Sequence, residues 1–248
     1  MAEVAKVALV TGAAQRIGAV IARTLHYQGY RVLLHYRRSF ACAEALAQEL
    51  NAIRTDSCRL LQADLEQMDQ VEQLAVEATN SFGRIDLLVN NASDFYPTPL
   101  ESSDQQQWDS LINSNLRGAY FLCARLADQL KQHNGAVINL IDIHAQRALP
   151  GYPIYSIAKA GLQMMTLSLA KELAPEVRVN GVAPGPILWP EAAAAISPAE
   201  QQAILDKTLL GRAGTPEDIA SAVAFLARAP FITGQVLAVD GGKSLYSH

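Results

Sequence analysis

The stretch VAKVALVTGAAQRIGAVIARTLHYQG, residues 4–29, decides the fold of this chain. A continuous apolar run over residues 4–11 ends at Gly12, and residues 16–29 then space their apolar side chains for one face of a helix. A pair of glycines alone is weak evidence, but here the turn follows a strand and opens a helix. Backbone N–H groups and the helix dipole then converge on the turn. We therefore predict that residues 12–18, with Gly12, Ile17 and Gly18, receive the pyrophosphate of a dinucleotide.

The rest of the chain repeats this alternation. Strands are expected at residues 4–11, 31–36, 57–62, 85–90, 136–141, 177–182 and 235–239. Helices are expected at residues 16–29, 40–53, 71–82, 104–132, 155–173 and 217–227. Because these strands are apolar runs, the pattern predicts a single-domain α/β Rossmann fold over residues 1–248, a doubly wound, seven-stranded parallel sheet with helices on both faces. The irregular residues 184–212 form either a substrate loop or a simple surface insertion.

Composition narrows the class of protein. Half of the 248 residues are hydrophobic, which suffices for one substantial core, and the net charge of -4 without runs of Lys or Arg argues against nucleic-acid binding. No apolar run approaches about 20 residues and no leader is recognisable, so we expect no membrane insertion and a cytoplasmic location. Cys42, Cys58 and Cys123 are expected to be reduced packing residues. The histidines lack metal-site spacing, so no metal is expected, and a role for the loop residue His144 stays open.

The end of the second predicted strand reads HYRRS, comprising His35, Tyr36, Arg37, Arg38 and Ser39. NAD-binding folds usually carry an acid here, and this chain has none. Two guanidinium groups and a hydroxyl suit a 2'-phosphate, so NADP(H) is predicted as the cofactor. The alternative is a solvated helix start, although cations at that position oppose the helix dipole. Asp64, which closes the third strand, is a candidate acceptor for the adenine amino group.

The segment NLIDIHAQRALPGYPIYSIAK, residues 139–159, carries the candidate chemistry. Asp142 follows a strand, whereas Tyr155 and Lys159 are four residues apart and share a helix face. An ammonium beside a phenol is expected to lower the phenol pKa and to suit it to proton transfer. The Tyr-x-x-x-Lys pair alone is common on ordinary helices, so its meaning depends on the surrounding motifs.

Six ordered landmarks make nearly the whole chain resemble the short-chain dehydrogenase/reductase family. They are Thr11-Gly12 with Gly18, Asn90-Asn91-Ala92, Asn115, Tyr155 with Lys159, Pro184-Gly185, and Asp240-Gly241-Gly242. The resemblance implies a Rossmann fold, often a homotetramer built on helix pairs, with Tyr155 as proton donor and Lys159 on the nicotinamide ribose. It also implies that Asn115 joins a water-linked relay with Lys159, that Asn91, Ala92, Pro184 and Gly185 border the cofactor, and that the backbone of Ile187 meets the carboxamide.

At three positions the chain departs from the family pattern, and there it resembles the pteridine reductase branch. Asp142 stands where most members have Ser, Arg16 replaces the middle glycine of the turn, and SDFYP follows Asn-Asn-Ala. This resemblance implies that Arg16 reaches the pterin or the cofactor phosphates, that Ser93 bonds the polar edge of the pterin, and that Phe95 stacks on it. Asp142 would relay a proton to Tyr155. Two structural alternatives remain: Phe95 as a core aromatic and Asp142 as a loop cap.

The predicted function is NADPH-dependent reduction of a dihydropterin to its tetrahydro form, with dihydrofolate and dihydromonapterin as further candidate substrates. Tyr152, Leu188 and Trp189 are expected to border the same pocket, in a segment that lacks the threonine with which the family closes over the cofactor. A 3-oxoacyl-thioester or other carbonyl reductase is the rival enzyme. A non-catalytic NADPH-sensing or scaffold protein is the rival of another class.

Overall fold

The computed structural model describes residues 5–189 and 194–245, so the expectations for residue 4 and for residues 190–193 lie outside the described residues. The strands are β1 (Val7–Val10), β2 (Arg31–Tyr36), β3 (Cys58–Gln62), β4 (Leu87–Asn90), β5 (Ala136–Leu140), β6 (Arg178–Pro184) and β7 (Val236–Val239). They form one sheet in the order β3-β2-β1-β4-β5-β6-β7, in which every neighbouring pair is parallel. The predicted seven-stranded parallel Rossmann fold is confirmed.

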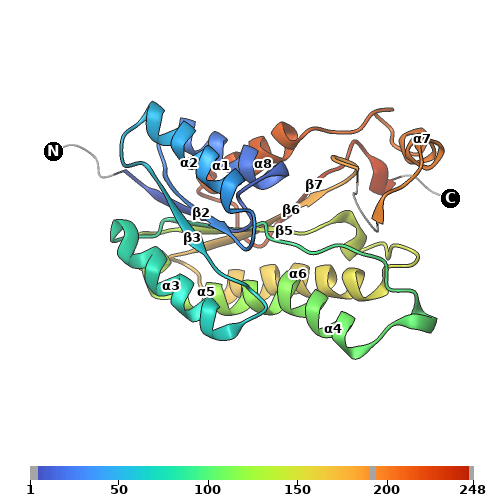
Figure 1. Ribbon diagram of the computed structural model, residues 1–248, viewed down its shortest axis with the longest axis horizontal. Coiled ribbons are helices and arrows are strands. Elements are labelled where there is room, and N and C mark those ends of the chain that lie inside the picture. The colour runs from blue at the N-terminus through green and yellow to red at the C-terminus, as the bar shows by residue number, and fades with distance from the viewer. Residues whose placement is uncertain (1–4, 190–193, 246–248) are drawn as a thin grey trace.

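Helices cover both faces of the sheet, as Figure 1 shows. One face packs against α1 (Arg16–Tyr27), α2 (Phe40–Ile53) and α8 (Pro216–Arg228), and the other against α3 (Met68–Phe82), α5 (Gly118–Gln132) and α6 (Pro153–Glu172). Successive strand residues point to opposite faces, so Val7 and Leu9 belong to one core cluster whereas Ala8 and Val10 belong to the other. This two-sided burial is why the strands read as continuous apolar runs.

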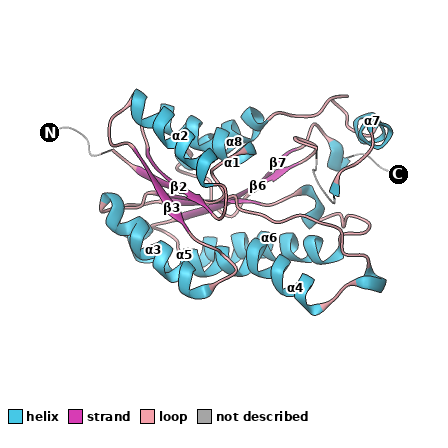
Figure 2. Ribbon diagram, viewed as in Figure 1, coloured by secondary structure: helices cyan, strands magenta, loops and turns pink. Residues whose placement is uncertain are grey.

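The strand order reverses at β1, whose neighbours are β2 and β4. At such a switch point the loops that leave the carboxyl ends of the two strands diverge and open a crevice. Figure 2 shows the sheet between the two helical layers, with α7 (Pro198–Asp206) set apart at one end of the molecule. The fold therefore brings the glycine turn, the end of β2 and the segment after β4 to one place.

The long helix expected over residues 104–132 is confirmed, with one irregularity inside it. It runs without a break through α4 (Gln105–Ile112), a π-helical segment Asn113–Arg117, and α5. Asn115 lies in this π segment, and its side-chain amide donates to the carbonyls of Leu111 and Asp94, both at 3.0 Å. Single π turns inside helices occur frequently at functional sites. The tertiary bond to Asp94 supports the wider turn, and the local sequence does not reveal it.

The segment 184–212, expected to be irregular, contains α7. Ser197 and Glu200 form a capping box, because the Ser197 hydroxyl accepts from the Glu200 N–H and the Glu200 carboxylate accepts from the Ser197 N–H. Serine followed three residues later by glutamate is a recognised helix-start signal. Pro198 at the first helical position strengthens it. This helix was therefore visible in the sequence.

The three cysteines do not behave alike. Cys58 and Cys123 are buried, and burial raises the pKa of each thiol to about 12, as expected for packing residues. Cys42 is exposed on α2, so its assignment as a packing residue was wrong. Among the described residues, no helix has the length and apolar character needed to cross a bilayer.

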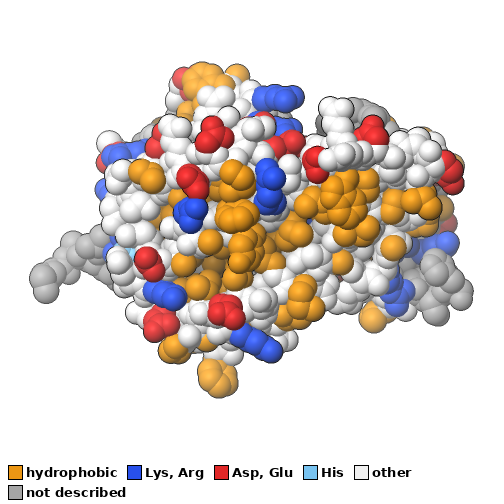
Figure 3. Space-filling model, turned by 90° about the horizontal axis from the view of Figure 1, so that it is seen from below, with side chains coloured by type: hydrophobic (Ala, Val, Ile, Leu, Met, Phe, Trp, Pro, Cys, Tyr) orange, Lys and Arg blue, Asp and Glu red, His pale blue; other side chains and the backbone are white. Residues whose placement is uncertain are grey.

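The face covered by α3 to α6 is partly apolar. Figure 3 looks onto this face and shows hydrophobic side chains gathered near its middle. The exposed apolar side chains of these helices include Val76, Trp108, Tyr120, Ile157 and Met164. Soluble proteins seldom leave a contiguous apolar patch uncovered without a binding role, so this face is a candidate assembly surface.

Candidate active site

The glycine turn between β1 and α1 is tightly constrained. A Cβ on Gly12 would lie 2.9 Å from the Cα of Ala92, and a Cβ on Gly18 would lie 2.2 Å from the carbonyl oxygen of Gly12. Arg16 has a φ of 54°, in the left-handed region that suits glycine. A non-glycine residue held in such a conformation costs about 1–3 kcal/mol, and such residues cluster at functional sites. The replacement of a family glycine by Arg16 is therefore a strained position rather than a neutral one.

The turn offers unpaired donors to an anion. No side chain caps the start of α1, so the first-turn N–H groups of Ile17 and Gly18 have no capping acceptor there. A cavity of about 530 Å³ lies in front of them. The Asn91 and Ala92 N–H groups both donate to the Thr11 hydroxyl, at 2.9 and 3.0 Å, which fixes the segment after β4 against the turn. Donor chemistry and space both fit a dinucleotide pyrophosphate.

His35 is buried behind this turn. Its Nδ1 accepts from the Gly12 N–H at 3.1 Å, and its Nε2 faces the Ala63 carbonyl at 3.1 Å. A ring that accepts at one nitrogen and donates at the other is neutral. Burial lowers the pKa of His35 to about 4. Although His35 lines the cavity, both of its nitrogens bind the protein, so its geometry is that of a support for the glycine turn.

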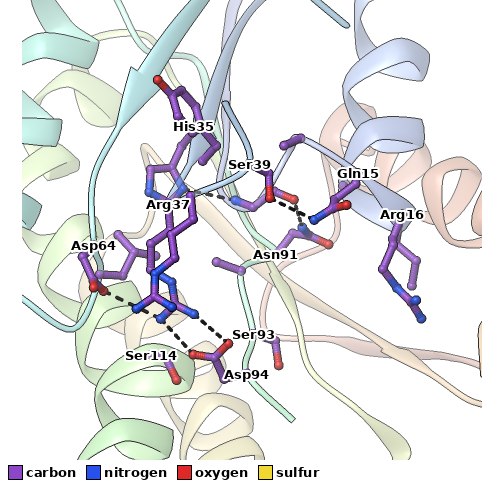
Figure 4. Close-up of a pocket in the computed structure, with 18 residues that line it drawn as sticks. Gln15, Arg16, His35, Arg37, Ser39, Asp64, Asn91, Ser93, Asp94 and Ser114 are labelled. Atoms are coloured by element: carbon purple, nitrogen blue, oxygen red, sulfur yellow. Dashed lines mark hydrogen bonds and ion pairs between the residues drawn. The ribbon is translucent and has the colours of Figure 1, made fainter. Parts of the chain in front are cut away.

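The two arginines predicted to act together point to different surroundings. The Arg37 guanidinium donates to Glu66 at 2.8 Å and to both oxygens of Asp94 at 3.1 and 3.2 Å, and it lies 3.9 Å from Asp64. Figure 4 shows Arg37 turned toward Asp64 and Asp94. Arg38 is exposed, and within the described part of the chain it forms no ion pair. Glu66 and Asp94 were missed by sequence reasoning.

Three further residues predicted to bind the cofactor, Tyr36, Ser39 and Asp64, line the same cavity. Tyr36 is buried, and Ser39 precedes the first turn of α2, where its hydroxyl accepts from the Gln15 amide at 3.0 Å. Asp64 lines the cavity with one carboxylate oxygen bonded to the Glu66 N–H. This cavity thus combines the glycine turn with the ends of β2 and β3, the elements that hold the adenosine half of a dinucleotide in Rossmann folds.

A second cavity of about 740 Å³ adjoins the first. Arg16, Ile17, Asn91 and Ser93 line both cavities, so the two are neighbours across the glycine turn. Its floor includes the predicted residues Pro184, Gly185 and Ile187, and its walls include Leu188 and Trp189. The Arg16 guanidinium donates to the Trp189 carbonyl at 3.1 Å and so links the turn to the segment after β6.

Asp142 and Tyr155 form a direct pair in this second cavity. The Tyr155 hydroxyl donates to one oxygen of Asp142 at 2.7 Å, while the other oxygen accepts from the His144 N–H at 2.9 Å. The alternative of Asp142 as a loop cap is therefore confirmed, whereas the relay of a proton between Asp142 and Tyr155 stays a prediction. The His144 ring lies 3.0 Å from the Arg147 carbonyl, measured from Nδ1. Asp142 thus caps the short 3-10 helix Ile143–Ala145 and also bonds the phenol.

The expected lowering of the Tyr155 pKa was wrong for this structure. Burial and the nearby Asp142 carboxylate raise the pKa of Tyr155 well above its ordinary value. The Lys159 ammonium lies 5.6 Å from the centre of the Tyr155 ring and donates to the Leu140 carbonyl at 3.0 Å. Burial lowers the pKa of Lys159 to about 8, against the opposing effect of Asp142. Here the phenol is therefore held as a protonated donor.

Asn115 connects the π segment to the loop after β4. Its side-chain oxygen accepts from the Ser93 hydroxyl at 2.6 Å, and its amide donates to the Asp94 carbonyl at 3.0 Å. Lys159, on α6, has its own bond to Leu140. The water-linked relay between Asn115 and Lys159 stays a prediction. What the geometry adds is a bond from Asn115 to Ser93, a predicted substrate contact.

Three aromatic rings line the cavity together. Phe95 stacks on Tyr152 with centroids 4.6 Å apart and an interplanar angle of 7°, and it meets Tyr155 edge-on at 4.8 Å. Phe95 is half-buried and lines the cavity, so it is a wall residue and not a core aromatic. Sequence reasoning missed Arg147, Lys207 and Lys243, which line the same cavity from distant parts of the chain. Within the residues described, no cluster suited to a metal ion is present.

Comparisons with known proteins agree with this geometry. Residues 12–244 match the family described as Enoyl-(Acyl carrier protein) reductase. The chain is 39% identical over 241 residues to the 3-oxoacyl-[acyl-carrier-protein] reductase FabG of Staphylococcus aureus, covering 96% of this chain and 97% of the relative. It is 37% identical over 283 aligned residues to pteridine reductase 1 of Leishmania tarentolae, covering 97% of each chain. The chain therefore belongs to the short-chain dehydrogenase/reductase family, an oxidoreductase family whose members use NAD(P)H.

Proposed function

We propose that this chain is an NADPH-dependent pteridine reductase that reduces a dihydropterin to the tetrahydro form. The relatives alone do not decide the substrate, since a 3-oxoacyl thioester reductase and a pteridine reductase match almost equally well. The observation that carries the proposal is the 2.7 Å bond between the Tyr155 hydroxyl and Asp142, in a cavity walled by Phe95.

The chemistry of the two substrates separates them. A hydroxyl donor beside the tyrosine steadies the oxygen of a ketone, whereas reduction of a C=N bond requires a proton at ring nitrogen. When bound, a nicotinamide would supply the hydride for the ring carbon. Tyr155, whose raised pKa keeps it protonated, donates its proton to the ring nitrogen, so the C=N bond becomes a C–N single bond with an N–H. The Asp142 carboxylate, which lines the cavity, then takes up a proton from solvent water and passes it to the Tyr155 phenolate, so both groups return to their starting states.

The other residues of the site bind and orient. Lys159 lines the cavity from α6, and its ammonium would hold the nicotinamide ribose. Phe95 and Tyr152 form an aromatic wall. A flat heterocycle can stack beside this pair, or between the two rings once they separate. Ser93, oriented by Asn115, offers a hydroxyl to the polar edge of the ring.

We assign the preference for NADPH to Arg38 and Ser39. Arg38 is exposed at the cavity, and Ser39 stands before the start of α2, where no side chain caps the first turn. A guanidinium, a hydroxyl and a helix N-terminus together favour a 2'-phosphate. Arg37, already surrounded by three carboxylates, contributes less to that contact.

The test is a substrate panel with NADPH. We expect dihydrobiopterin or dihydromonapterin to be reduced faster than a 3-oxoacyl thioester. The matched variants are Asp142→Ser, which restores the family residue, and Asp142→Asn, which keeps the size and removes the charge. Both should slow pterin reduction by about 10²-fold or more, since proton delivery is impaired. A faster reaction with the thioester in the unaltered enzyme would replace the pterin assignment, and no turnover with any substrate would favour the sensing or scaffold alternative.

We also propose that copies of the chain assemble through the apolar face of α4, α5 and α6, as a homotetramer. The exposed side chains of Trp108 on α4, Tyr120 on α5 and Met164 on α6 support it. Light scattering of the purified protein measures the mass directly, and Tyr120→Glu should reduce that mass. A monomer in the unaltered protein at micromolar concentration would contradict the proposal.

A further inference from the structure

His144 lines the second cavity and has no part in the chemistry proposed above. It lies in the short 3-10 helix Ile143–Ala145, two residues after Asp142, and its side chain is half-buried. The His144 N–H donates to one oxygen of Asp142 at 2.9 Å, and the other oxygen accepts from the Tyr155 hydroxyl at 2.7 Å. A single turn of the chain therefore carries both the imidazole and the carboxylate that bonds the proton donor.

The contact with Arg147 determines which nitrogen of the imidazole can exchange a proton. Nδ1 of His144 lies 3.0 Å from the Arg147 carbonyl, and a carbonyl oxygen can only accept. Nδ1 therefore carries a hydrogen in both the neutral and the charged ring. Within the described part of the chain no hydrogen bond is made to Nε2, which leaves this nitrogen for the cavity. Imidazole is also the side chain that ordinarily exchanges protons near neutral pH.

Proton donation by Tyr155 leaves excess negative charge in the site. The phenolate that remains faces the Asp142 carboxylate across a contact of 2.7 Å. Two like charges at this distance disfavour each other. Burial and the same carboxylate already hold the pKa of Tyr155 well above its ordinary value. The pair must therefore regain one proton in every turnover, and the supply of that proton determines how fast the site is restored.

The other ionisable groups of the cavity are less suited to supply this proton. On α6, burial lowers the pKa of Lys159 to about 8, but its ammonium donates to the Leu140 carbonyl and lies 5.6 Å from the centre of the Tyr155 ring. Tyr152 stacks on Phe95. The remaining cations of the lining ordinarily titrate above pH 10, and they are Arg16, Arg147, Lys207 and Lys243.

We propose that His144 is a proton-relay residue that resupplies the Asp142–Tyr155 pair from solvent. The inference rests on the proposed function, in which Tyr155 gives up one proton per turnover. The imidazolium releases its Nε2 proton to a water molecule that enters the cavity, that water passes a proton to the Asp142 carboxylate, and Asp142 passes one to the Tyr155 phenolate. The neutral ring then takes up a proton at Nε2 from bulk solvent. Each cycle consumes one solvent proton, and all three side chains return to their starting states.

The first experiment compares His144→Asn with the unaltered enzyme between pH 6 and pH 8.5. The Asn amide can replace Nδ1 as donor to the Arg147 carbonyl, but it cannot relay a proton. Asp142 then depends on hydronium ions, which become scarcer as the pH rises. We expect the kcat of the variant to lie within twofold of the unaltered value at pH 6 and to be about tenfold lower at pH 8.5, with KM unchanged. A ratio of the two kcat values that is constant with pH would overturn the relay.

Chemical rescue examines the same step in a second variant. His144→Ala removes the ring and leaves space for added imidazole, which should raise kcat about fivefold at pH 8. The matched control is His133→Asn, because His133 is half-buried at the end of α5 and lines neither cavity. Its kcat should equal that of the unaltered enzyme at every pH and should not respond to imidazole. If imidazole does not raise the kcat of His144→Ala, the relay is refuted.

A measurement without turnover separates this inference from the proposed function. In protein labelled with ¹⁵N-histidine, NMR at pH 9 distinguishes the two neutral tautomers, and the His144 resonance is the one that His144→Asn removes. We expect the hydrogen on Nδ1, and a hydrogen on Nε2 would contradict the relay whatever the substrate. If the substrate panel favours a 3-oxoacyl thioester, the pterin assignment fails. The His144 variants are then assayed with that thioester, whose reduction also consumes one proton in each turnover.

Discussion

The two adjoining cavities differ in how their charges are arranged. In the cavity at the ends of β2 and β3, Arg37 is paired with three carboxylates and His35 is neutral and bonded at both nitrogens. In the cavity beside β5 and β6, the cations Lys207 and Lys243 have no described carboxylate partner. The first cavity is therefore preorganised by the protein's own ion pairs and hydrogen bonds, whereas the second contains two lysines that no described carboxylate pairs with.

Removal of the Tyr155 hydroxyl should have the largest effect, and it should be confined to the second cavity. Tyr155→Phe keeps the edge contact with Phe95 but removes the proton that is donated to the ring nitrogen. We expect kcat to fall about 10²–10⁴-fold, the usual contribution of a positioned general acid. Fluorescence titration should show that NADPH still binds with unchanged affinity.

Tyr96→Phe is the control for this variant. The Tyr96 hydroxyl is 3.4 Å from the Gln107 carbonyl, and Tyr96 lines neither cavity, so its loss should leave kcat unchanged. A Tyr155→Phe enzyme that retains more than a third of the original kcat would remove Tyr155 from proton transfer and return attention to Asp142 alone.

The buried His35 of the first cavity should make the free energy of unfolding depend on pH. His35 has a pKa of about 4 in the folded protein and about 6.5 in the unfolded chain, so the unfolded chain binds its proton more readily. The stabilisation is present above about pH 6.5 and is lost as the pH falls toward 4. It amounts to about 3 kcal/mol. Urea unfolding between pH 4 and 7 measures it as the difference between the unaltered protein and His35→Asn, whose amide oxygen can accept from Gly12 but does not titrate. Parallel pH curves for the two proteins would show that His35 does not titrate as described.

The fold was predictable because the burial of strands and helix faces appears in the sequence as regular patterns of apolar residues. Strands buried on both faces read as apolar runs, and the turn after β1 carries the glycines that its close contacts require. The capping box of α7 was also present in the sequence, but the prediction did not use it. The π segment was not legible, because it depends on the bond between the Asn115 amide and the Asp94 carbonyl, which lies 21 residues away.

The sequence predicted which residues line the site better than it predicted their pKa values and their partners. The sequence places Lys159 one helical turn from Tyr155, but only the folded chain shows that Lys159 faces Leu140 while Asp142 meets the phenol. In the same way Arg37 and Arg38 are neighbours in the sequence. Glu66 and Asp94, which lie 29 and 57 residues from Arg37 in the sequence, accept hydrogen bonds from Arg37 and not from Arg38. A side chain's pKa and its partners depend on where that side chain points in the folded protein. The spacing of residues along the chain does not determine this orientation.

Arg38 should carry most of the discrimination between the two dinucleotides. Arg38→Met removes the exposed guanidinium beside the start of α2, and we expect the Kd for NADPH to rise about tenfold while that for NADH changes less than twofold. Calorimetric titration with both dinucleotides measures this, and Arg212→Met, which lines neither cavity, is the control. Equal losses for NADPH and NADH would show that Arg38 does not contact the 2'-phosphate.

Arg37 should give the smallest effect and the most informative one, because it lines the first cavity and bonds Asp94, whose neighbours in the chain line the second. Asp94, which it holds, stands in the chain between Ser93 and Phe95 of the substrate cavity. We expect Arg37→Met to raise the pterin KM about threefold, since half-exposed ion pairs are each worth less than about 1 kcal/mol, and to weaken NADPH and NADH equally. Arg37→Met and Asp94→Asn should then be non-additive in KM when combined, because each already breaks the same contact. Additive effects would show that Arg37 acts only on the dinucleotide, and that the charge of one cavity does not influence the geometry of the other.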